Sequence, residues 1–191
     1  MLIITQAETI DAYPPLREDL LLVGYASYII ELLDRFTYEE GENRPLYKLL
    51  ADTLERLAAQ PDPNLVVRYY EIRLLDLLGF RPQLFSCVRC EREIIPEDQY
   101  FSAEIGGVLC PRCGRETPGT RHISLTALKY LRHLQRSSFS EAARLNIPPQ
   151  INREMEILMQ HYLTYLLERN LNTPAFLRRI AGGANNDILG N

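Results

Sequence analysis

The segment YYEIRLLDLLGFRPQLFSCVRC, residues 69–90, contains both features that decide the fold of this chain. Its first part belongs to a run from residue 65 to residue 80 that is apolar around most of the circumference of a helix. A helix with apolar residues on nearly every side must be buried. We therefore expect this helix at the centre of a helical bundle, ending near Gly79. The second part ends in a Cys-x2-Cys pair, which is typical of a metal site.

Four more helices are predicted from the spacing of their apolar residues. They cover residues 17–36, 45–60, 124–137 and 149–171. On the first of them, the residues expected to form a solvent-facing polar stripe are Gly24, Ser27, Tyr28, Glu31 and Asp34 or Arg35. These helices flank the central one on both sides in the sequence, which favours a bundle.

All four cysteines of the chain lie between the central helix and residue 121. They are Cys87, Cys90, Cys110 and Cys113, with the spacing C-x2-C-x19-C-x2-C. A Cys-x2-Cys turn directs two thiolates at one metal ion, and two β-like runs around Gly106-Gly107 predict a hairpin that returns the second pair to the same point. Four thiolates leave no open coordination position, so we expect one structural Zn²⁺ per chain. The predicted fold class is mainly α: a helical bundle domain with an inserted four-cysteine, zinc-ribbon-like β-hairpin.

Three other interpretations of the cysteines stay open. The thiols could form two disulfides, act as a redox switch that releases zinc on oxidation, or remain buried and metal-free. Zinc is preferred because persistent disulfides are rare in the cytoplasm and because a metal supplies folding energy to a segment too small for its own core. Arg89, Arg92 and Arg112 lie in or beside the two turns and can partly offset the charge of a zinc–thiolate centre.

Composition and charge restrict the class of function. Hydrophobic residues make up 46% of the 191 residues, which is ordinary for a globular protein. The chain has no apolar run of about 18 residues and no signal peptide, so we expect a cytoplasmic protein without membrane contact. The net charge of −4 is uneven: it is −6 over residues 1–60, −2 over residues 61–113 and +4 over residues 114–191.

Catalytic motifs are missing from the sequence. The three histidines lie outside the cysteine pairs, and there is no HExxH, no GxSxG and no glycine-rich phosphate loop. The chain is therefore predicted not to be an enzyme. Nineteen of its 21 basic residues are arginines, which suit bidentate contacts with phosphates or carboxylates, although codon usage is an equal explanation.

A basic stripe is predicted on the helix 124–137. Lys129, Arg132, His133 and Arg136 follow one another at helical spacing, and Arg121 leads into them. Such a stripe can neutralise several phosphates, so the candidate DNA-binding residues are Arg121, Lys129, Arg132 and Arg136. An ordinary solvated helix face is the competing interpretation. Because no aromatic residue is interleaved with these charges, we expect contact with the phosphate backbone rather than base stacking.

The order of these features resembles the RecO family of recombination mediator proteins. The segment at 69–90, followed by YFSAEIGGVLCPRC at 100–113, carries the likeness, and ITQAETIDAYPPLREDL at 4–20 looks like the family's join between an N-terminal OB-fold and the helices. The likeness extends over nearly the whole chain. It implies that the four cysteines are metal ligands, and that the protein binds single- and double-stranded DNA, contacts RecR and single-strand-binding protein, and acts indirectly on RecA.

The resemblance also suggests how the chain is divided. The expected parts are a remnant of an OB-fold strand with a linker (1–10), a helical domain in two pieces (11–83 and 122–181), a four-cysteine zinc module (84–121) and a disordered tail (182–191). With most of the OB-fold missing, weak binding and poor annealing of single strands are expected.

The predicted function is that of a non-catalytic DNA repair and recombination accessory protein in the RecF-pathway manner. Its expected location is the nucleoid-associated cytoplasm. Two alternatives remain: a zinc-stabilised scaffold for protein interactions without DNA binding, and a thiol redox sensor.

Overall fold

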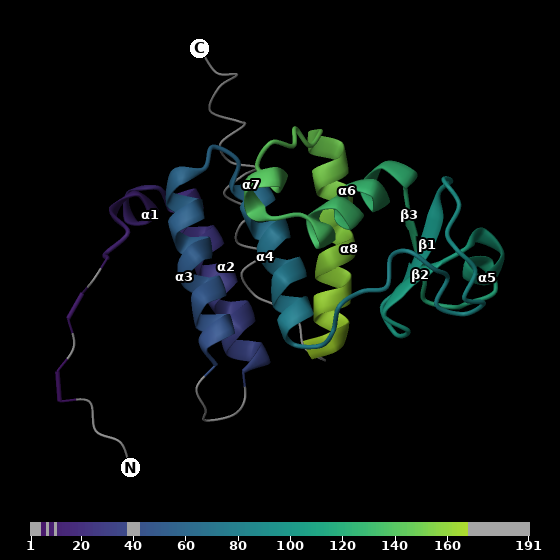
Figure 1. Cartoon of the computed structure of the whole chain (residues 1–191), viewed down its shortest axis with the longest axis horizontal. Coiled ribbons are helices and arrows are strands. Elements are labelled where there is room, and N and C mark those ends of the chain that lie inside the picture. Colours follow the sequence, from purple (N-terminus) through teal and green to yellow (C-terminus); the bar gives the residue numbers. More distant parts are fainter. Residues whose placement is uncertain (1–4, 7, 10, 38–42, 168–191) are drawn as a thin grey trace.

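The computed structural model describes residues 5–6, 8–9, 11–37 and 43–167. Within them the chain is mainly helical, as the sequence predicts, and it carries a small three-stranded antiparallel sheet, of which the sequence predicts only the hairpin. Figure 1 shows a bundle of helices with the sheet and α5 at one end, beyond α6 and α8. The predicted tail at 182–191 and most of the predicted strand and linker at 1–10 lie outside the described residues.

The elements have the following bounds. The helices of the described part are α1 Pro14–Glu18, α2 Leu20–Phe36, α3 Arg44–Ala59, α4 Pro63–Leu77, α5 Pro111–Arg115, α6 Leu125–Arg136, α7 Phe139–Ala142 and α8 Pro149–Leu167. The strands are β1 Gln99–Ser102, β2 Gly107–Leu109 and β3 Arg121–Ile123. Sequence periodicity did not predict α5, α7 or β3, which have only three to five residues each.

Helix α4 is the centre of the bundle, as its apolar circumference predicts. It packs against α2, α3, α6, α7 and α8, and every residue from 65 to 72 is buried. The side chain of Asp62 accepts from the N–H groups of Asn64 and Leu65 and so caps the start of the helix. Gly79 lies just past the end with a φ of 81°, a conformation that favours glycine, which confirms the predicted stop.

The polar stripe predicted on α2 is exposed at Ser27 and Asp34 but is wrong at Gly24 and Tyr28. Gly24 and Tyr28 are buried, whereas Leu20 and Ile30 keep 63% and 50% of their surface exposed. Tyr28 faces the core because its hydroxyl donates to the Glu71 carboxylate at 2.5 Å, so that its polar end has a partner inside the bundle. The predicted helix 17–36 is also divided, since Asp19 ends α1 and caps α2 by accepting from the N–H groups of Leu21 and Leu22.

A charged pair lies beside Tyr28 in the core. The Arg68 Nη1 is 2.8 Å from the Glu71 Oε2, and both residues are buried. Burial raises the pKa of Glu71 to about 7, although the Arg68 guanidinium and the Tyr28 hydroxyl act in the opposite direction. The carboxylate of Glu71 is therefore less stable in the folded chain than in water.

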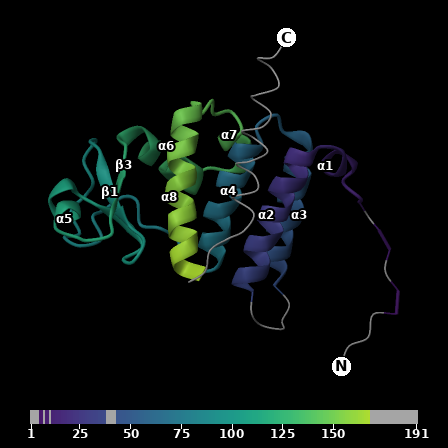
Figure 2. The same cartoon turned by 180° about the vertical axis from the view of Figure 1, so that it is seen from behind.

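The sheet has the order β2-β1-β3 and packs against α8. The hairpin predicted around Gly106-Gly107 is present as β1 and β2, with Phe101 opposite Val108. The ring of Phe101 meets that of Tyr162 on α8 edge to face at 5.3 Å, which joins the sheet to the bundle. Seen from behind in Figure 2, α6 and α8 lie between the sheet and the α2–α3 side of the molecule.

We call residues 78–86, which run from α4 to the first cysteine pair, the connector. Its backbone pairs with the hairpin: the N–H of Gln83 donates to the Gly106 carbonyl, and the N–H of Val108 donates to the Gln83 carbonyl. A Cβ at Gly107 would come within 2.6 Å of the Gln83 carbonyl, so glycine permits this close approach. Among the described residues, no helix combines the length and hydropathy that a membrane span requires.

Candidate metal centre and basic helix face

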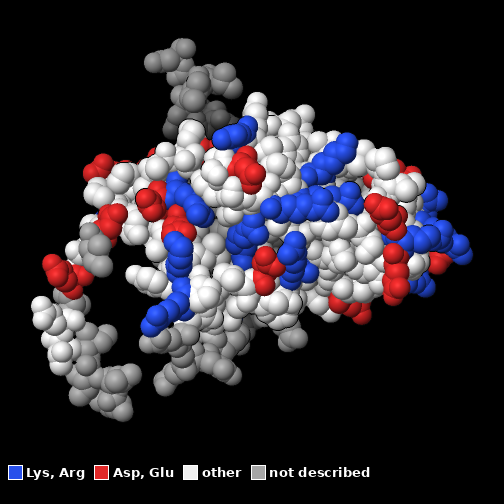
Figure 3. Space-filling model, in the orientation of Figure 1, with Lys and Arg blue, Asp and Glu red and all other residues white. Residues whose placement is uncertain are grey.

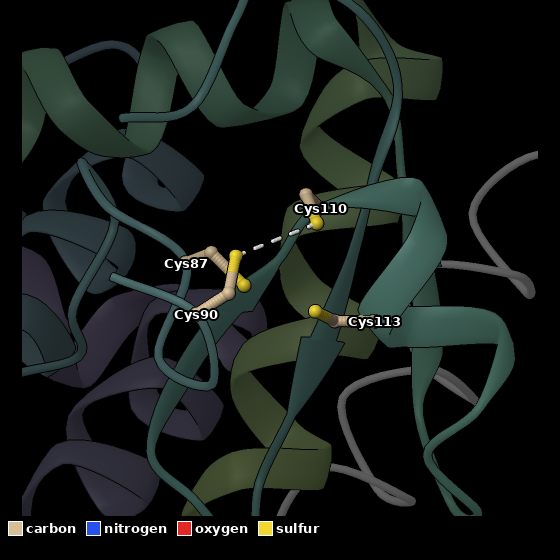
Figure 4. Close-up of side chains that lie close together, drawn as sticks. All are labelled: Cys87, Cys90, Cys110 and Cys113. Atoms are coloured by element: carbon tan, nitrogen blue, oxygen red, sulfur yellow. Dashed lines mark hydrogen bonds between the residues drawn. The ribbon is translucent and has the colours of Figure 1, made fainter. Parts of the chain in front are cut away.

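The four cysteines converge on one point. Cys87 and Cys90 follow the connector, Cys110 caps the start of α5 and Cys113 lies within it. Their sulfur atoms all lie within 4.8 Å of one another. Figure 4 shows the first pair facing the second, and its dashed line joins the Sγ atoms of Cys90 and Cys110, which are 3.9 Å apart.

This arrangement fits a tetrahedral metal ion. Zinc–thiolate bonds of about 2.3 Å imply sulfur–sulfur separations of about 3.8 Å in a regular tetrahedron. The observed separation of 3.9 Å between Cys90 and Cys110 is close to that value. A disulfide would require about 2.05 Å, and all four cysteines are free thiols.

The two cysteine turns have the same pattern of backbone hydrogen bonding, but different residues follow their second cysteines. In each turn the N–H after the second cysteine donates to the carbonyl of the first at 2.8 Å, from Glu91 to Cys87 and from Gly114 to Cys110. Glu91 has a φ of 61°, which a residue with a side chain rarely adopts. At Gly114 a side chain is excluded by lack of space, because a Cβ would lie 2.4 Å from the ring of Tyr100.

The surroundings shift the pKa values of Cys113 and Cys87 in opposite directions. Burial raises the pKa of Cys113 to about 12, and the other three thiols act in the same direction. Burial also opposes ionisation of Cys87, but backbone hydrogen bonds with Cys110, Cys90 and Arg89 lower its pKa to about 6. Four thiolates within 4.8 Å repel one another, and a divalent cation would remove this repulsion.

The arginines expected to offset the thiolate charge have different surroundings. Arg89 donates to the Glu116 carboxylate at 3.4 Å and to the Thr117 hydroxyl, so its charge is partly used elsewhere. Arg92 and Arg112 line a surface hollow of about 270 Å³ together with Cys110. These two arginines therefore share a surface with a cysteine of the cluster, whereas the guanidinium of Arg89 is engaged by Glu116 and Thr117.

The basic stripe of α6 forms a shallow hollow of about 260 Å³. Its lining residues in the described part of the chain are Lys129, Arg132, His133 and Arg136. All four are basic, and Figure 3 shows lysine and arginine side chains gathered over α6 on this face. We call this feature the basic hollow. It brings together three of the four candidate DNA-binding residues.

Arg121 does not line the basic hollow. It begins β3 and is exposed there. Its charge reaches His161 on α8, whose pKa is lowered by burial and by the Arg121 guanidinium. The four candidate residues therefore divide into a group of three on α6 and one residue on the sheet.

The connector lies along the polar side of α6 and uses part of the stripe. Arg132 donates from Nε to the Leu84 carbonyl at 2.7 Å, and Gln135 donates to the Pro82 carbonyl at 2.9 Å. The guanidinium carbons of Arg132 and Arg136 lie 5.1 and 3.7 Å from the centre of the Phe85 ring. Sequence analysis missed Phe85, because helical spacing detects only neighbours within one helix and Phe85 comes from the connector.

Known proteins resemble this chain over most of its length. The family model described as "Recombination protein O C terminal" matches residues 17–175, a range that includes α2 to α8 and all four cysteines. No catalytic residue follows from this description.

Relatives from several bacteria carry the name DNA repair protein RecO, and three of them illustrate the likeness. The protein from Roseiflexus sp. (strain RS-1) is 39% identical over 175 residues, which are 92% of this chain and 62% of the relative. The protein from Dehalococcoides mccartyi (strain ATCC BAA-2100 / JCM 16839 / KCTC 5957 / BAV1) is 37% identical over 87% of this chain and 65% of the relative. The protein from Moorella thermoacetica is 36% identical over 94% of this chain and 67% of the relative.

The chain thus spans 62% and 65% of the lengths of the first two relatives. Its match to the family model covers most of its own length and includes the whole cysteine segment. The chain therefore belongs to the recombination protein O family.

Proposed function

We propose that this chain is a non-catalytic accessory protein of DNA repair and recombination that contacts DNA and holds one structural zinc ion. The observation that carries the proposal is the family match over residues 17–175, which encloses both the cysteine cluster and the basic hollow. The names of the relatives supply the biological process. The whole relatives are longer than this chain, so the proposal concerns the part that this chain contains.

The zinc ion would hold the turn after the connector against the turn that follows the β1–β2 hairpin. Cys87 and Cys90 would bind it from one turn, and Cys110 and Cys113 from the start of α5. Four sulfur donors in a tetrahedron favour zinc or an iron–sulfur cluster, and they leave no position for a substrate or water. The ion's role in the proposal is therefore structural, and the surrounding module is zinc-ribbon-like.

The DNA contact is proposed for the basic hollow. The chain as a whole is net negative, so phosphate binding requires a local excess of positive charge such as Lys129 and Arg136 provide. Arg132 contributes charge but also donates to Leu84. Arg121 would extend the contact onto the sheet. RecR and single-strand-binding protein are proposed as protein partners and RecA as an indirect one, in the nucleoid-associated cytoplasm, from the family resemblance.

Salt-dependent DNA binding tests the proposal. Fluorescence anisotropy of a labelled oligonucleotide, measured over a series of salt concentrations, is expected to show affinity falling with salt. Replacing Lys129 and Arg136 by Ala should weaken binding to every sequence and lower the slope of log K against log salt by about two. Arg132 is kept because its loss would release the connector. Arg153→Ala, which removes an exposed arginine on α8, is the matched control.

The outcome also separates the proposal from a protein-interaction scaffold. That alternative is favoured by the exposed apolar residues Leu20, Val23 and Ile30 on α2. No detectable binding to DNA at low salt, with correctly folded protein, would contradict DNA contact and leave the scaffold.

A further inference from the structure

We infer that Phe85, with Arg132, Arg136 and Glu93 around it, forms a pocket for one unpaired base of a single-stranded nucleic acid whose phosphate lies in the basic hollow. The inference rests on the proposed DNA-binding function and specifies its substrate. It replaces the expectation of backbone contact alone, because the connector supplies the aromatic ring that α6 lacks.

Two hollows adjoin on this face of the molecule. The basic hollow is one of them. The second, which we call the Phe85 pocket, has a volume of about 320 Å³ and includes Phe85, Ile94, Glu91 and Glu93 among its lining residues. Arg132 and Arg136 line both hollows, so the two form one continuous surface with a purely basic end and an end that contains an aromatic ring.

Arg132 and Arg136 both have guanidinium N–H groups available to donate to an anion. Arg136 stacks over the Phe85 ring at 3.7 Å, an arrangement that orients the guanidinium while leaving its edge N–H groups available. It has no ion-pair partner among the described residues. Arg132 donates from Nε to Leu84, but its Nη2 is buried without a hydrogen-bond partner. Burial lowers the pKa of Arg132 and so does the charge of Arg136, whereas Glu93 acts in the opposite direction. A phosphate between the two guanidiniums would relieve their repulsion.

The Phe85 pocket suits a base rather than a second phosphate. A base can stack on an aromatic ring or on a guanidinium plane. Because Arg136 already covers one face of the Phe85 ring at 3.7 Å, the base would stack on the outer face of this guanidinium or on the ring surface that it leaves free. Glu91 and Glu93 are exposed carboxylates at this end, and they repel phosphate toward the basic hollow. A carboxylate accepts from the amino group of a base, as it does from N4 of cytosine. In a duplex both faces of a base are stacked on its neighbours, so stacking in the pocket requires an unpaired base.

An acidic peptide fits this surface less well. It would meet the arginines of the basic hollow, but its carboxylates would be repelled by Glu91 and Glu93 in the neighbouring pocket. A nucleotide alternates one negative phosphate with one neutral ring that carries hydrogen-bond donors. That alternation matches the adjoining basic and aromatic ends.

The test compares Phe85→Leu with Lys129→Ala in the full chain. Lys129 lines only the basic hollow, and Phe85 only the aromatic pocket of the pair. Affinities are measured by anisotropy for labelled single strands of dC and of dT and for a duplex of equal length. Phe85→Leu should weaken single-strand binding about fivefold or more and leave duplex binding and the salt slope unchanged. Lys129→Ala should weaken both substrates and lower the salt slope by about one.

Two further variants sharpen the result. Phe85→Tyr keeps the aromatic face and should retain single-strand affinity, provided that thermal melting shows it folded. Glu93→Gln should reduce the preference for dC over dT, because thymine offers no amino group to the carboxylate.

The outcomes separate the inference from the proposed function. Equal effects of Phe85→Leu on single strands and duplex, or no effect on either, would overturn the base pocket while Lys129→Ala still supported DNA contact. No salt-dependent binding by the unmodified chain would overturn both. Binding of a labelled acidic peptide that depends on Phe85, without binding of single strands, would overturn the inference in favour of a protein ligand.

Discussion

The helical bundle and the cysteine segment differ in how much apolar surface each can bury. In the bundle, α4 is covered by five other helices and every residue from 65 to 72 is buried. In the cysteine segment, residues 84–121, the strands have only three or four residues, and Cys87 and Cys113 are themselves among the buried side chains. A bundle of this kind is stabilised by its core, whereas so small a segment requires a cross-link such as a metal. The two regions should therefore respond to different perturbations.

Removing one metal ligand should have the largest effect, and only in the cysteine segment. Cys110→Ser is expected to release zinc and to loosen residues 84–121, since structural zinc contributes about 10 kcal/mol or more to small metal-dependent units. Metal analysis of the purified variant and hydrogen exchange across the segment would measure both effects. Arg89→Ala, in the first cysteine turn, is the matched control and should keep its zinc. Retention of zinc by Cys110→Ser would contradict the four-ligand site.

A cavity beside α4 should destabilise the bundle and leave the cysteine segment unaffected. Leu74 is fully buried, so Leu74→Ala is expected to lower the free energy of unfolding of the bundle by about 2 to 5 kcal/mol. Leu77 is 49% exposed on the same helix, and its replacement by Ala should cost far less. Urea denaturation followed by circular dichroism measures the difference. Zinc content should stay unchanged in both variants, and parallel loss of zinc in Leu74→Ala would mean that the two regions are not independent.

The free energy of unfolding of the bundle should depend on pH because the pKa of Glu71 is raised in the folded chain. Its pKa is about 7 in the folded chain and 4.5 without burial, so between these values the folded state holds a proton that unfolding releases. The contribution of protonated Glu71 to the free energy of unfolding is fully present below pH 4.5 and is lost as the pH rises to 7. The total loss is about 3 kcal/mol at most. Denaturation of wild type and Glu71→Gln at several pH values measures this. The difference in stability between them should change across that range, and a constant difference would contradict the raised pKa.

The two cysteine turns provide the smallest and most local comparison. Gly114→Ala places a Cβ against Tyr100 and is expected to destabilise the cysteine segment by about 1 to 3 kcal/mol. Glu91→Gly relieves a left-handed backbone and should stabilise it by about 1 kcal/mol. Competition for zinc with a coloured chelator would measure both changes as shifts in metal affinity. The same sign of shift for both variants would mean that the two turns do not differ as described.

The features that the sequence predicted correctly depend on spacing over short stretches of chain. The burial of α4 follows from its apolar circumference, and the cysteine cluster follows from two Cys-x2-Cys pairs around a glycine hairpin. What it missed depends on partners far along the chain. Tyr28 looks polar in its own helix and is buried because Glu71, 43 residues later, accepts its hydrogen bond. Phe85 joins the arginines of α6 only because the connector crosses that helix. The short β3 has no periodicity to detect and exists because β1 supplies its hydrogen-bond partners.

Hydrogen exchange of the unmodified chain, with and without a zinc chelator, tests the division between the two regions most directly. The chelator should abolish protection of the backbone amides in residues 84–121 while the amides of α4 keep theirs, because α4 contributes no metal ligand and is covered by five other helices. Unchanged protection of residues 84–121 after chelation, or equal loss in both regions, would contradict a metal-fastened segment attached to a self-sufficient bundle.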